Sequence, residues 1–388
     1  MFKKTACVIL VLMTVVLGGC WDNREITNIE IVTGVGIDKT PDGAIEITAQ
    51  IISPSKSGGS QSSSGYSQNS GSTINITAVG ATVSDAAFNL AAKTGKNMLL
   101  MHTQLMVISE AAAKDGLGKI WDYFERDHEV NRMMWIIIAK NGTAKSVLDS
   151  SPDIENINAV QITDTFDTKV NFGKTAGIQS FKVSELLSEP RTGIVTSVIE
   201  PDGLTDLKDM KVEGSAVLVH SKLAGYLDAD ETRGYLFAAN QEYGTILNIA
   251  NPEEKGRLVA IEVVTSDGKL TAEMKDGKPV LGIEIKAQGN IGDEQGGADL
   301  TDENDVKALQ RESEALISQN IQLAVMKSQK VFDCDIFDFN GLLYKYHYSD
   351  FQKIADNWDE LYKNTDIKIS VLFQLQRPGV ILKPAYKQ

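Results

Sequence analysis

Cysteine is scarce in this chain of 388 residues, which contains only Cys7, Cys20 and Cys334. A disulfide framework needs cysteines in pairs at a much higher density, so this fold must be held together by its apolar core. Hydrophobic residues make up 42% of the chain, which is enough material for such a core. By length alone, two or three domains are expected.

An excess of positive charge is also missing. The chain has 38 Lys and Arg against 52 Asp and Glu, which gives a formal net charge of −14 at pH 7. Nucleic acids and anionic lipid headgroups both bind basic surfaces, so neither is an expected partner.

The motifs that carry most enzyme chemistry are absent as well. The sequence has no Gly-x-Ser-x-Gly elbow, no His-Glu-x-x-His and no paired-cysteine metal motif, and its four histidines are scattered. Gly173-Lys174-Thr175 resembles the end of a phosphate-binding loop, but Thr168 stands where that loop needs its first glycine. The acidic residues around Arg126 could form a metal or general-acid site, but a solvated helix end is the simpler explanation. We therefore expect no catalytic site, no cofactor and no metal.

The N-terminus has the features of a lipoprotein signal peptide. Two lysines precede an apolar run over Ala6–Leu17, which leads into Gly18-Gly19-Cys20. This run is shorter than the about 20 residues of a membrane-spanning helix, so it predicts a secretory signal. Lipoprotein signal peptidase recognises a Leu-x-Gly-Cys ending. The sequence thus predicts a signal peptide over 1–19 and a lipid on Cys20 that anchors the protein to a membrane.

An N-terminal α/β domain is predicted over 20–150. Ile29–Ile37 and Ala44–Ile52 are β-rich stretches joined by a Pro-Asp-Gly turn, which predicts a hairpin. The Ser- and Gly-rich segment 53–73 is expected to be a flexible loop, because it can bury too little to offset its ordering entropy. The later patterns predict a helix capped by Ser84, a strand over Met98–Ser109, a helix over Leu117–Arg126 and a central strand over Met133–Ala139.

A middle subdomain is predicted over 151–250. It has a helical pattern around Val183–Leu187 and two short strand-like stretches, Gly214–His220 and Lys222–Leu227. No internal repeat is found, so a solenoid is not expected.

A C-terminal α+β domain is predicted over 251–388. Asp267-Gly268 and Asp276-Gly277 separate three strand-like stretches, which predicts an antiparallel meander. An amphipathic helix from Thr301 or Asp302 to about Lys330 and a strand over Ile367–Leu375 complete this domain. The expected fold is α+β and multi-domain, with mixed and antiparallel sheets each covered by helices and a C-terminal β-meander plus long helix.

Several short motifs follow one another along the chain. They are Gly19-Cys20-Trp21-Asp22-Asn23-Arg24-Glu25-Ile26, Ile31–Asp38, Phe124–Asp127 with the strand Trp135–Lys140, Glu231–Leu236, Asp335–Asn340 and Asn357–Glu360. Together, and in this order, they resemble the Ger(x)C lipoproteins, the C subunits of bacterial spore germinant receptors. Asp338 and Asn340 depart from the family pattern, which has glycine at both positions.

The resemblance implies a non-catalytic, lipid-anchored subunit on the outer face of the spore inner membrane. Its implied partners are two integral membrane subunits, A and B, with which it would support receptor assembly or couple nutrient detection to germination. An alternative function is that of a solute-binding lipoprotein of a transporter. Such proteins usually have two lobes of parallel βαβ units, whereas the Asp-Gly hairpins predict antiparallel pairing.

Four residues beside the lipid site are candidates for an interface or a structural motif: Trp21, Asp22, Arg24 and Glu25. Tryptophan favours a membrane interface, where one edge of its ring is apolar and the other is hydrated. Whether this segment lies at the membrane or folds against the first sheet is left open by the sequence.

A second candidate group lies at Glu231, Arg233, Gly234 and Tyr235. Glu231 and Arg233 are predicted to flank a turn and could form a buried ion pair. Such a pair costs several kcal/mol of desolvation per ion unless its hydrogen bonds are complete. The pair is therefore expected either to lock the fold or to contact a partner.

Overall fold

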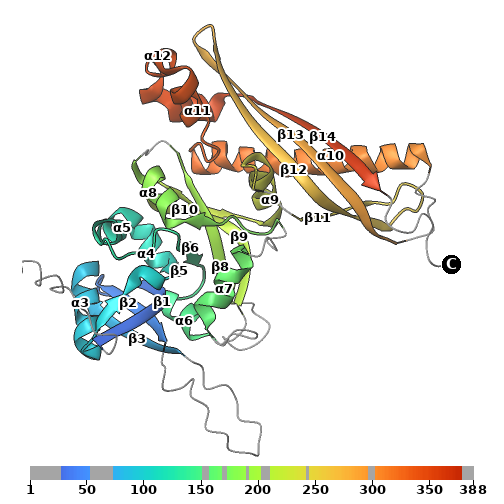
Figure 1. Ribbon diagram of the computed structural model, residues 1–388. Coiled ribbons are helices and arrows are strands. Elements are labelled where there is room, and N and C mark those ends of the chain that lie inside the picture. The colour runs from blue at the N-terminus through green and yellow to red at the C-terminus, as the bar shows by residue number, and fades with distance from the viewer. Residues whose placement is uncertain are drawn as a thin grey trace, which may run out of the picture.

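The computed structural model describes residues 28–52, 73–150, 157–167, 173–188, 192–201, 210–241, 244–295 and 302–377. These residues form two sheets, one of ten strands and one of four, with helices packed against both (Figure 1). This is the α+β, multi-sheet architecture that the sequence predicts. The predicted signal peptide 1–19 and nearly all of the predicted loop 53–73 lie outside the described residues.

The first sheet has the strand order β10-β9-β8-β6-β5-β1-β2-β3, and β4 and β7 pair with β1 and β6. Its centre, from β1 through β5 and β6 to β8, is parallel, while the strands on both sides are antiparallel. The strands are β1 Ile29–Lys39, β2 Ile45–Ile52, β3 Thr73–Gly80, β4 Asn97–Leu99, β5 Leu105–Ser109, β6 Trp135–Ala139, β7 Ile178–Gln179, β8 Ile194–Pro201, β9 Met210–Val219 and β10 Lys222–Leu227.

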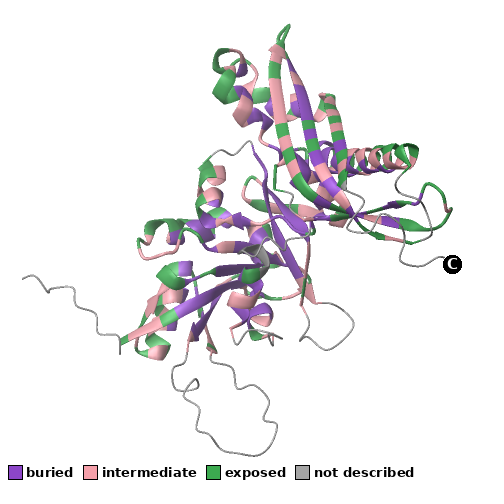
Figure 2. Ribbon diagram, turned by 45° about the vertical axis from the view of Figure 1, so that its right-hand side comes forward, coloured by how far each residue is buried: buried purple, intermediate pink, exposed green. Residues whose placement is uncertain are grey.

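Helices cover both faces of this sheet. On β5, Met106 and Ile108 pack toward α3 and α5, while Leu105 and Val107 pack toward α6 and α7. The helices are α3 Val83–Thr94, α4 Glu110–Asp115, α5 Leu117–Arg126, α6 Ala144–Asp149, α7 Asn158–Asp167 and α8 Ser180–Ser188. Because both faces of the sheet are covered, the central strands β5 and β6 are almost entirely apolar and buried. The prediction that Met133–Ala139 contains a central strand is confirmed. Figure 2 shows the buried strands in the middle of this sheet.

The hairpin predicted at the start of this sheet is confirmed. Strands β1 and β2 pair antiparallel, and the turn between them is closed by a hydrogen bond from the Thr40 N–H to the Ala44 carbonyl at 2.9 Å. Gly43 has φ 89°, a conformation that glycine adopts without strain.

Two predictions in the following stretch are wrong. Helix α3 is capped by Thr82, whose side chain accepts the N–H of Asp85 at 3.1 Å, and not by Ser84. The stretch Met98–Ser109 is not one strand, because a 3₁₀ turn over Leu100–His102 separates β4 from β5. This turn allows both short strands to pair with β1.

The second sheet has the order β11-β12-β13-β14, and only its last pair is parallel. Its strands are β11 Ile246–Ala250, β12 Leu258–Lys275, β13 Lys278–Glu294 and β14 Ile367–Arg377. Its helical elements are α9 Ala229–Ala238, α10 Glu303–Lys327, the π-turn Ser328–Phe332, α11 Phe339–Tyr346, α12 Tyr348–Phe351, the 3₁₀ turn Ala355–Asn357 and α13 Trp358–Asn364.

The meander is present, but it uses different strands from those predicted. Asp276-Gly277 forms the predicted turn, with φ 52° and 76°, whereas Asp267-Gly268 lies inside the continuous strand β12. Gly268 serves a different purpose there. A Cβ at this position would lie 2.2 Å from the Phe237 carbonyl oxygen, so the glycine lets α9 approach the strand directly.

Helix α10 lies along the second sheet (Figure 1). Asp302 caps it, as predicted, and Leu309, Ile317 and Ala324 are fully buried against the sheet. Leu323, on the same helix, is 37% exposed. Side chains of α10 also cover the outer edge of β14, where Glu314 accepts the N–H of Phe373 at 3.0 Å and Gln310 that of Leu375 at 3.2 Å.

One apolar core joins the two sheets. Val195 and Val217 of the first sheet belong to the same buried cluster as Leu236 of α9 and Ile283 of the second sheet. Strands β8 to β10, which lie in the predicted middle subdomain, are hydrogen-bonded into the same sheet as β1 to β6. The division at 150 and 250 stays a prediction.

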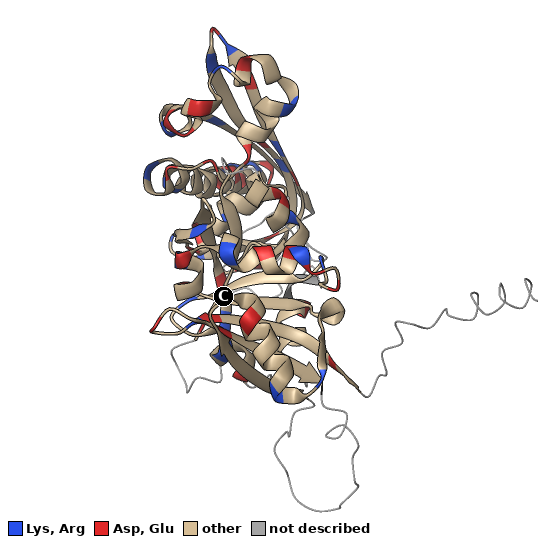
Figure 3. Cartoon of the chain, turned by 90° about the vertical axis from the view of Figure 1, so that its left-hand side faces the viewer, with Lys and Arg blue, Asp and Glu red and all other residues tan. Residues whose placement is uncertain are grey.

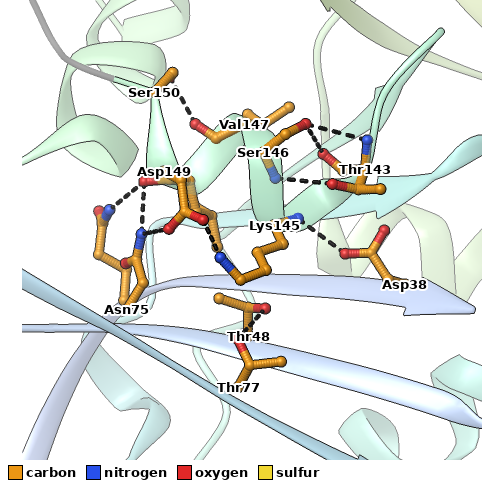
Figure 4. A network of polar contacts seen from close by, with 12 residues as sticks. Asp38, Thr48, Asn75, Thr77, Thr143, Lys145, Ser146, Val147, Asp149 and Ser150 are labelled. Carbon is orange, nitrogen blue, oxygen red and sulfur yellow. Dashed lines mark hydrogen bonds and ion pairs between the residues drawn. The ribbon is translucent and has the colours of Figure 1, made fainter. Parts of the chain in front are cut away.

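The Gly-x-Gly-x-Asp part of the motif Ile31–Asp38 is explained by helices that lie directly on β1. A Cβ on Gly34 would lie 2.8 Å from that of Ala159, and one on Gly36 would lie 3.2 Å from that of Ala144. Asp38, which is 5% exposed, adds a second cap to α6 besides the N-cap residue Thr143. Its two carboxylate oxygens accept the N–H groups of Ala144 and Lys145, each at 2.8 Å. Figure 4 shows the bond to Lys145.

We expect Asp38→Asn to lower the free energy of unfolding by about 1–3 kcal/mol, because one of two charge-assisted acceptors is replaced by an N–H₂ group that faces an N–H. Urea unfolding followed by circular dichroism measures this loss. Asp42→Asn, on the exposed turn of the same hairpin, is the control and should change stability little. Equal effects of the two substitutions would contradict the capping role.

Charged residues of both signs are interspersed over the described residues (Figure 3). Within this part of the chain, every helix is too short or too polar to cross a bilayer.

Candidate interface at the junction of the two sheets

The motif Glu231–Leu236 lies in helix α9, where the two sheets meet. The helix packs against α10 and contacts β9, β12 and β13. The side chain of Thr232 is fully buried and lies 3.2 Å from the Ser215 hydroxyl on β9. Thr232 therefore links α9 to the first sheet, while the helix as a whole also contacts α10 and the second sheet.

Glu231 fixes the start of α9 and ties it to α10. Its carboxylate accepts the N–H of Asp228, and the Asp228 carboxylate accepts the N–H of Glu231 in return, at 2.7 and 2.9 Å. This reciprocal arrangement is a capping box. The same Glu231 oxygen accepts a hydrogen bond from the ammonium of Lys327, at the end of α10, at 2.5 Å.

The predicted turn and the predicted Glu231–Arg233 pair are both wrong, because these residues lie within a helix and bind other partners. The Arg233 guanidinium donates to Asp230 at 3.1 Å. With the Asn320 amide oriented so that its oxygen faces Arg233, the same Nη1 atom also donates to Asn320 at 3.2 Å. Arg233 is thus a second link from α9 to α10.

Gly234 lies where α9 and α10 cross. A Cβ at this position would lie 2.0 Å from the carbonyl oxygen of Asn320 and 2.6 Å from the amide nitrogen of Ile321. Both atoms belong to the α10 backbone, so no side-chain rotation could make room. Glycine is therefore required for the two helices to pack at this distance.

Tyr235 connects α9 to the motif Asp335–Asn340. Its ring lies 5.8 Å from that of Phe337, centroid to centroid. Burial raises the pKa of the Tyr235 hydroxyl, and the carboxylates of Asp338 and Asp335 raise it further. Tyr235 is therefore neutral at physiological pH.

Asp335 is the centre of a buried polar network. Its carboxylate accepts N–H groups from the backbones of Phe337 and Asn340 at 3.0 and 2.9 Å, and from the Asn340 side chain at 3.1 Å. Asn340 also donates to the hydroxyl of Thr192 at 2.7 Å, and the Gly193 N–H donates to the Asp335 carbonyl at 2.8 Å. Residues 192 and 193 immediately precede β8, so this network ties the first sheet to the C-terminal part of the chain.

The two family glycine positions in this motif differ in what they require. Asp338 has φ 69°, a left-handed conformation that favours glycine, and its carboxylate accepts the Thr192 hydroxyl at 2.9 Å. Asn340 lies within α11, where no glycine is needed. The hydrogen bond from Thr192 thus offsets the left-handed conformation of Asp338. The side-chain amide of Asn340 donates hydrogen bonds within the network around Asp335.

The other candidate residues are placed as follows. Cys20, Trp21, Asp22, Arg24 and Glu25 lie outside the described residues. Glu231, Arg233, Gly234 and Tyr235 are brought together on α9, where the contacts described above are with other parts of the same chain. Sequence reasoning missed Lys327 and Asn320 as their partners.

The described residues show no group of three or more His, Cys, Asp or Glu side chains that could hold a metal. The hydroxyl of Thr175, in the phosphate-loop-like stretch, is buried and donates to the Gly214 carbonyl at 2.8 Å. That stretch therefore anchors β9. The arrangement of side chains at the junction is suited to fixing two sheets relative to each other.

Two protein families match consecutive parts of the chain. The family described as spore germination protein N-terminal domain matches residues 22–201, and the family described as spore germination B3/GerAC like, C-terminal, matches residues 213–379. Strands β9 and β10 of the first sheet fall almost entirely within the second match.

Whole proteins match over nearly their full lengths. The chain is 26% identical to spore germination protein KC of Bacillus subtilis (strain 168), covering 100% of this chain and 98% of the relative. It is 21% identical to spore germination protein B3 of the same organism, covering 97% and 98%. The crystal structure of the GerBC protein matches with a TM-score of 0.57 at 19% sequence identity, covering 88% of this chain and 97% of that chain, which shows a common fold.

Proposed function

Because the chain belongs to the Ger(x)C family of spore germination proteins, we propose that it is a non-catalytic subunit of a spore nutrient-germinant receptor. The observation that carries this proposal is the match of both family domains, in order, over nearly all of the chain. In this role the chain assembles with the integral membrane subunits A and B and supports receptor assembly or signal coupling.

The proposed location is the outer face of the spore inner membrane, with a diacylglyceryl group on Cys20 as the anchor. The lipobox-like ending Leu17-Gly18-Gly19-Cys20 supports this proposal. Lipid chains stabilise membrane attachment by about 0.8 kcal/mol per buried CH₂ group, so two of them hold a protein firmly. A solute-binding lipoprotein is the weaker alternative, because the second sheet is mainly antiparallel.

We expect Cys20→Ala to abolish retention of the protein in the spore membrane fraction and to weaken nutrient-triggered germination. The reason is that alanine has no sulfur to carry the diacylglyceryl group. Fractionation followed by immunoblotting measures retention, and mass spectrometry of the wild-type protein detects the thioether. Cys7→Ala, within the apolar run, is the matched control and should leave both properties unchanged. Normal membrane fractionation of Cys20→Ala would disprove the anchor.

Receptor membership is tested separately by co-purification. Crosslinked spores carrying an affinity-tagged copy of this chain should yield both integral membrane subunits. Crosslinks mapped onto this chain would identify the contacting face, and recovery of neither subunit would refute the proposed role even if the lipid were present.

A further inference from the structure

A cleft of about 400 Å³ lies on the first sheet between helices α3 and α5. Its floor consists of aliphatic side chains of β1 and β2, among them Val32, Val35 and Ile47. The two helices form its walls and lie side by side on this face of the sheet (Figure 1). Small-molecule sites in proteins typically occupy about 300–1,000 Å³ and have mainly apolar walls. The cleft is within this range.

Two aromatic residues make the cleft suited to an apolar ligand. Phe88, on α3, lines the cleft and is 73% exposed, although a phenyl ring gains free energy on burial. Tyr123, on α5, is half-buried and held by an edge-to-face contact with Phe124, with ring centroids 5.2 Å apart. A ligand with a flat or aliphatic body would cover the exposed phenyl ring without rearranging the core.

The charged residues that are described in the cleft are both acidic. Asp127 and Glu129, at the end of α5, both line it, and among the described residues that line it there is no Lys or Arg. The backbone N–H of Glu129 donates to Asp127 at 2.9 Å, which holds that carboxylate in place. Burial raises the pKa of the Tyr123 hydroxyl, and the negative charge of Asp127 raises it further. A ligand carrying a carboxylate would be repelled here, whereas an ammonium group would be attracted.

We propose that the cleft between α3 and α5 binds a small organic monocation, with an apolar aromatic or aliphatic body against Phe88 and Tyr123 and an ammonium group near Asp127. This site is independent of the proposed receptor role, since it rests on the geometry of the first sheet alone.

Three ligands that share an indole ring and a short side chain test the proposal: tryptamine, tryptophol and indole-3-propionate. In calorimetric titrations of the purified full-length chain, we expect tryptamine to bind with a sub-millimolar Kd, as suits a ligand of about 12 non-hydrogen atoms. Tryptophol should bind more weakly, and indole-3-propionate at least about tenfold more weakly than tryptamine. Equal affinities for the cation and the anion would overturn the proposed charge selection, and no binding of tryptamine would overturn the site.

Variants locate the site. Ala91→Trp, which fills the cleft from α3, should abolish tryptamine binding, and Asp127→Asn should reduce the preference for the cation. Asp122→Asn, on the same helix but outside the cleft, is the charge-matched control and should leave binding unchanged. If Ala91→Trp does not fold, Phe88→Ala serves instead, since its exposed side chain is not part of the core. Unchanged tryptamine binding in these cleft variants would place the ligand elsewhere and reject the proposal.

Discussion

Gly234→Ala is expected to lower the free energy of unfolding by about 3 kcal/mol or more, which is the upper end of the range for overpacked cores. The new Cβ would lie 2.0 Å from the Asn320 carbonyl oxygen, so α9 and α10 would have to move apart. This movement would also lengthen the contacts of Glu231 with Lys327 and of Arg233 with Asn320. Urea unfolding followed by tryptophan fluorescence measures the loss.

Gly118→Ala is the matched control for this substitution. Gly118 lies in α5, and a Cβ there would meet only the Ser221 hydroxyl at 3.8 Å, an ordinary contact. Alanine is the better helix former, so this variant should be as stable as the wild type or up to about 1 kcal/mol more stable. A Gly234→Ala chain that matched the wild type in stability would show that the two helices do not need to pack at this distance.

The stability contributed by Asp335 is expected to fall as the pH rises. Burial raises the pKa of Asp335 to about 7 from an ordinary value of 3.8, against the lowering effect of its Asn340 and Phe337 donors. Between these two values the folded state holds a proton that the unfolded state has released. The contribution is therefore fully present below about pH 4 and is lost as the pH passes 7.

Asp335→Asn tests this expectation, because asparagine resembles the protonated acid in shape and does not titrate. The stability advantage of the wild type over this variant should shrink by a few kcal/mol from pH 5 to pH 8, since one pKa unit corresponds to about 1.4 kcal/mol. Urea unfolding at both pH values provides the comparison, and taking the difference removes the contribution of the other carboxylates. An advantage that grew with pH would show that the three N–H donors outweigh burial.

The parts of the fold that were predicted correctly depend on local signals. The Pro-Asp-Gly turn fixes the β1–β2 hairpin, and the apolar run Trp135–Ala139 identifies a strand that is buried on both faces. Asp302 signals the start of α10 in the same way. In each case, neighbouring residues in the sequence determine the conformation.

The errors have two causes: a tertiary contact overrides a local signal, or a local signal was overlooked. Asp267-Gly268 has the sequence of a tight turn, yet β12 continues through it. The glycine is there because the Phe237 carbonyl oxygen of α9 packs directly against it. Helix α9 itself was missed, although Asp228 and Glu231 have the spacing of a capping box and could have revealed its start.

For the candidate site, the sequence identified the residues but not their partners. Glu231 binds Lys327, and the Asp335 carbonyl accepts a hydrogen bond from Gly193, just before β8. Each partner is therefore distant along the chain. A single sequence carries no signal that relates such positions. The motif was therefore recognised by resemblance, and only the structure shows what its residues contact.

The occupied edge of β14 limits how another protein could associate with the second sheet. Unpaired N–H groups at a sheet edge normally invite a foreign strand, and here the side chains of Glu314 and Gln310 already accept those of Phe373 and Leu375. A strand of another protein could not pair with β14 at these residues unless α10 first moved away from the sheet. Association by β-augmentation is thus disfavoured on that side, which leaves side-chain surfaces, rather than backbone edges, to mediate recognition there.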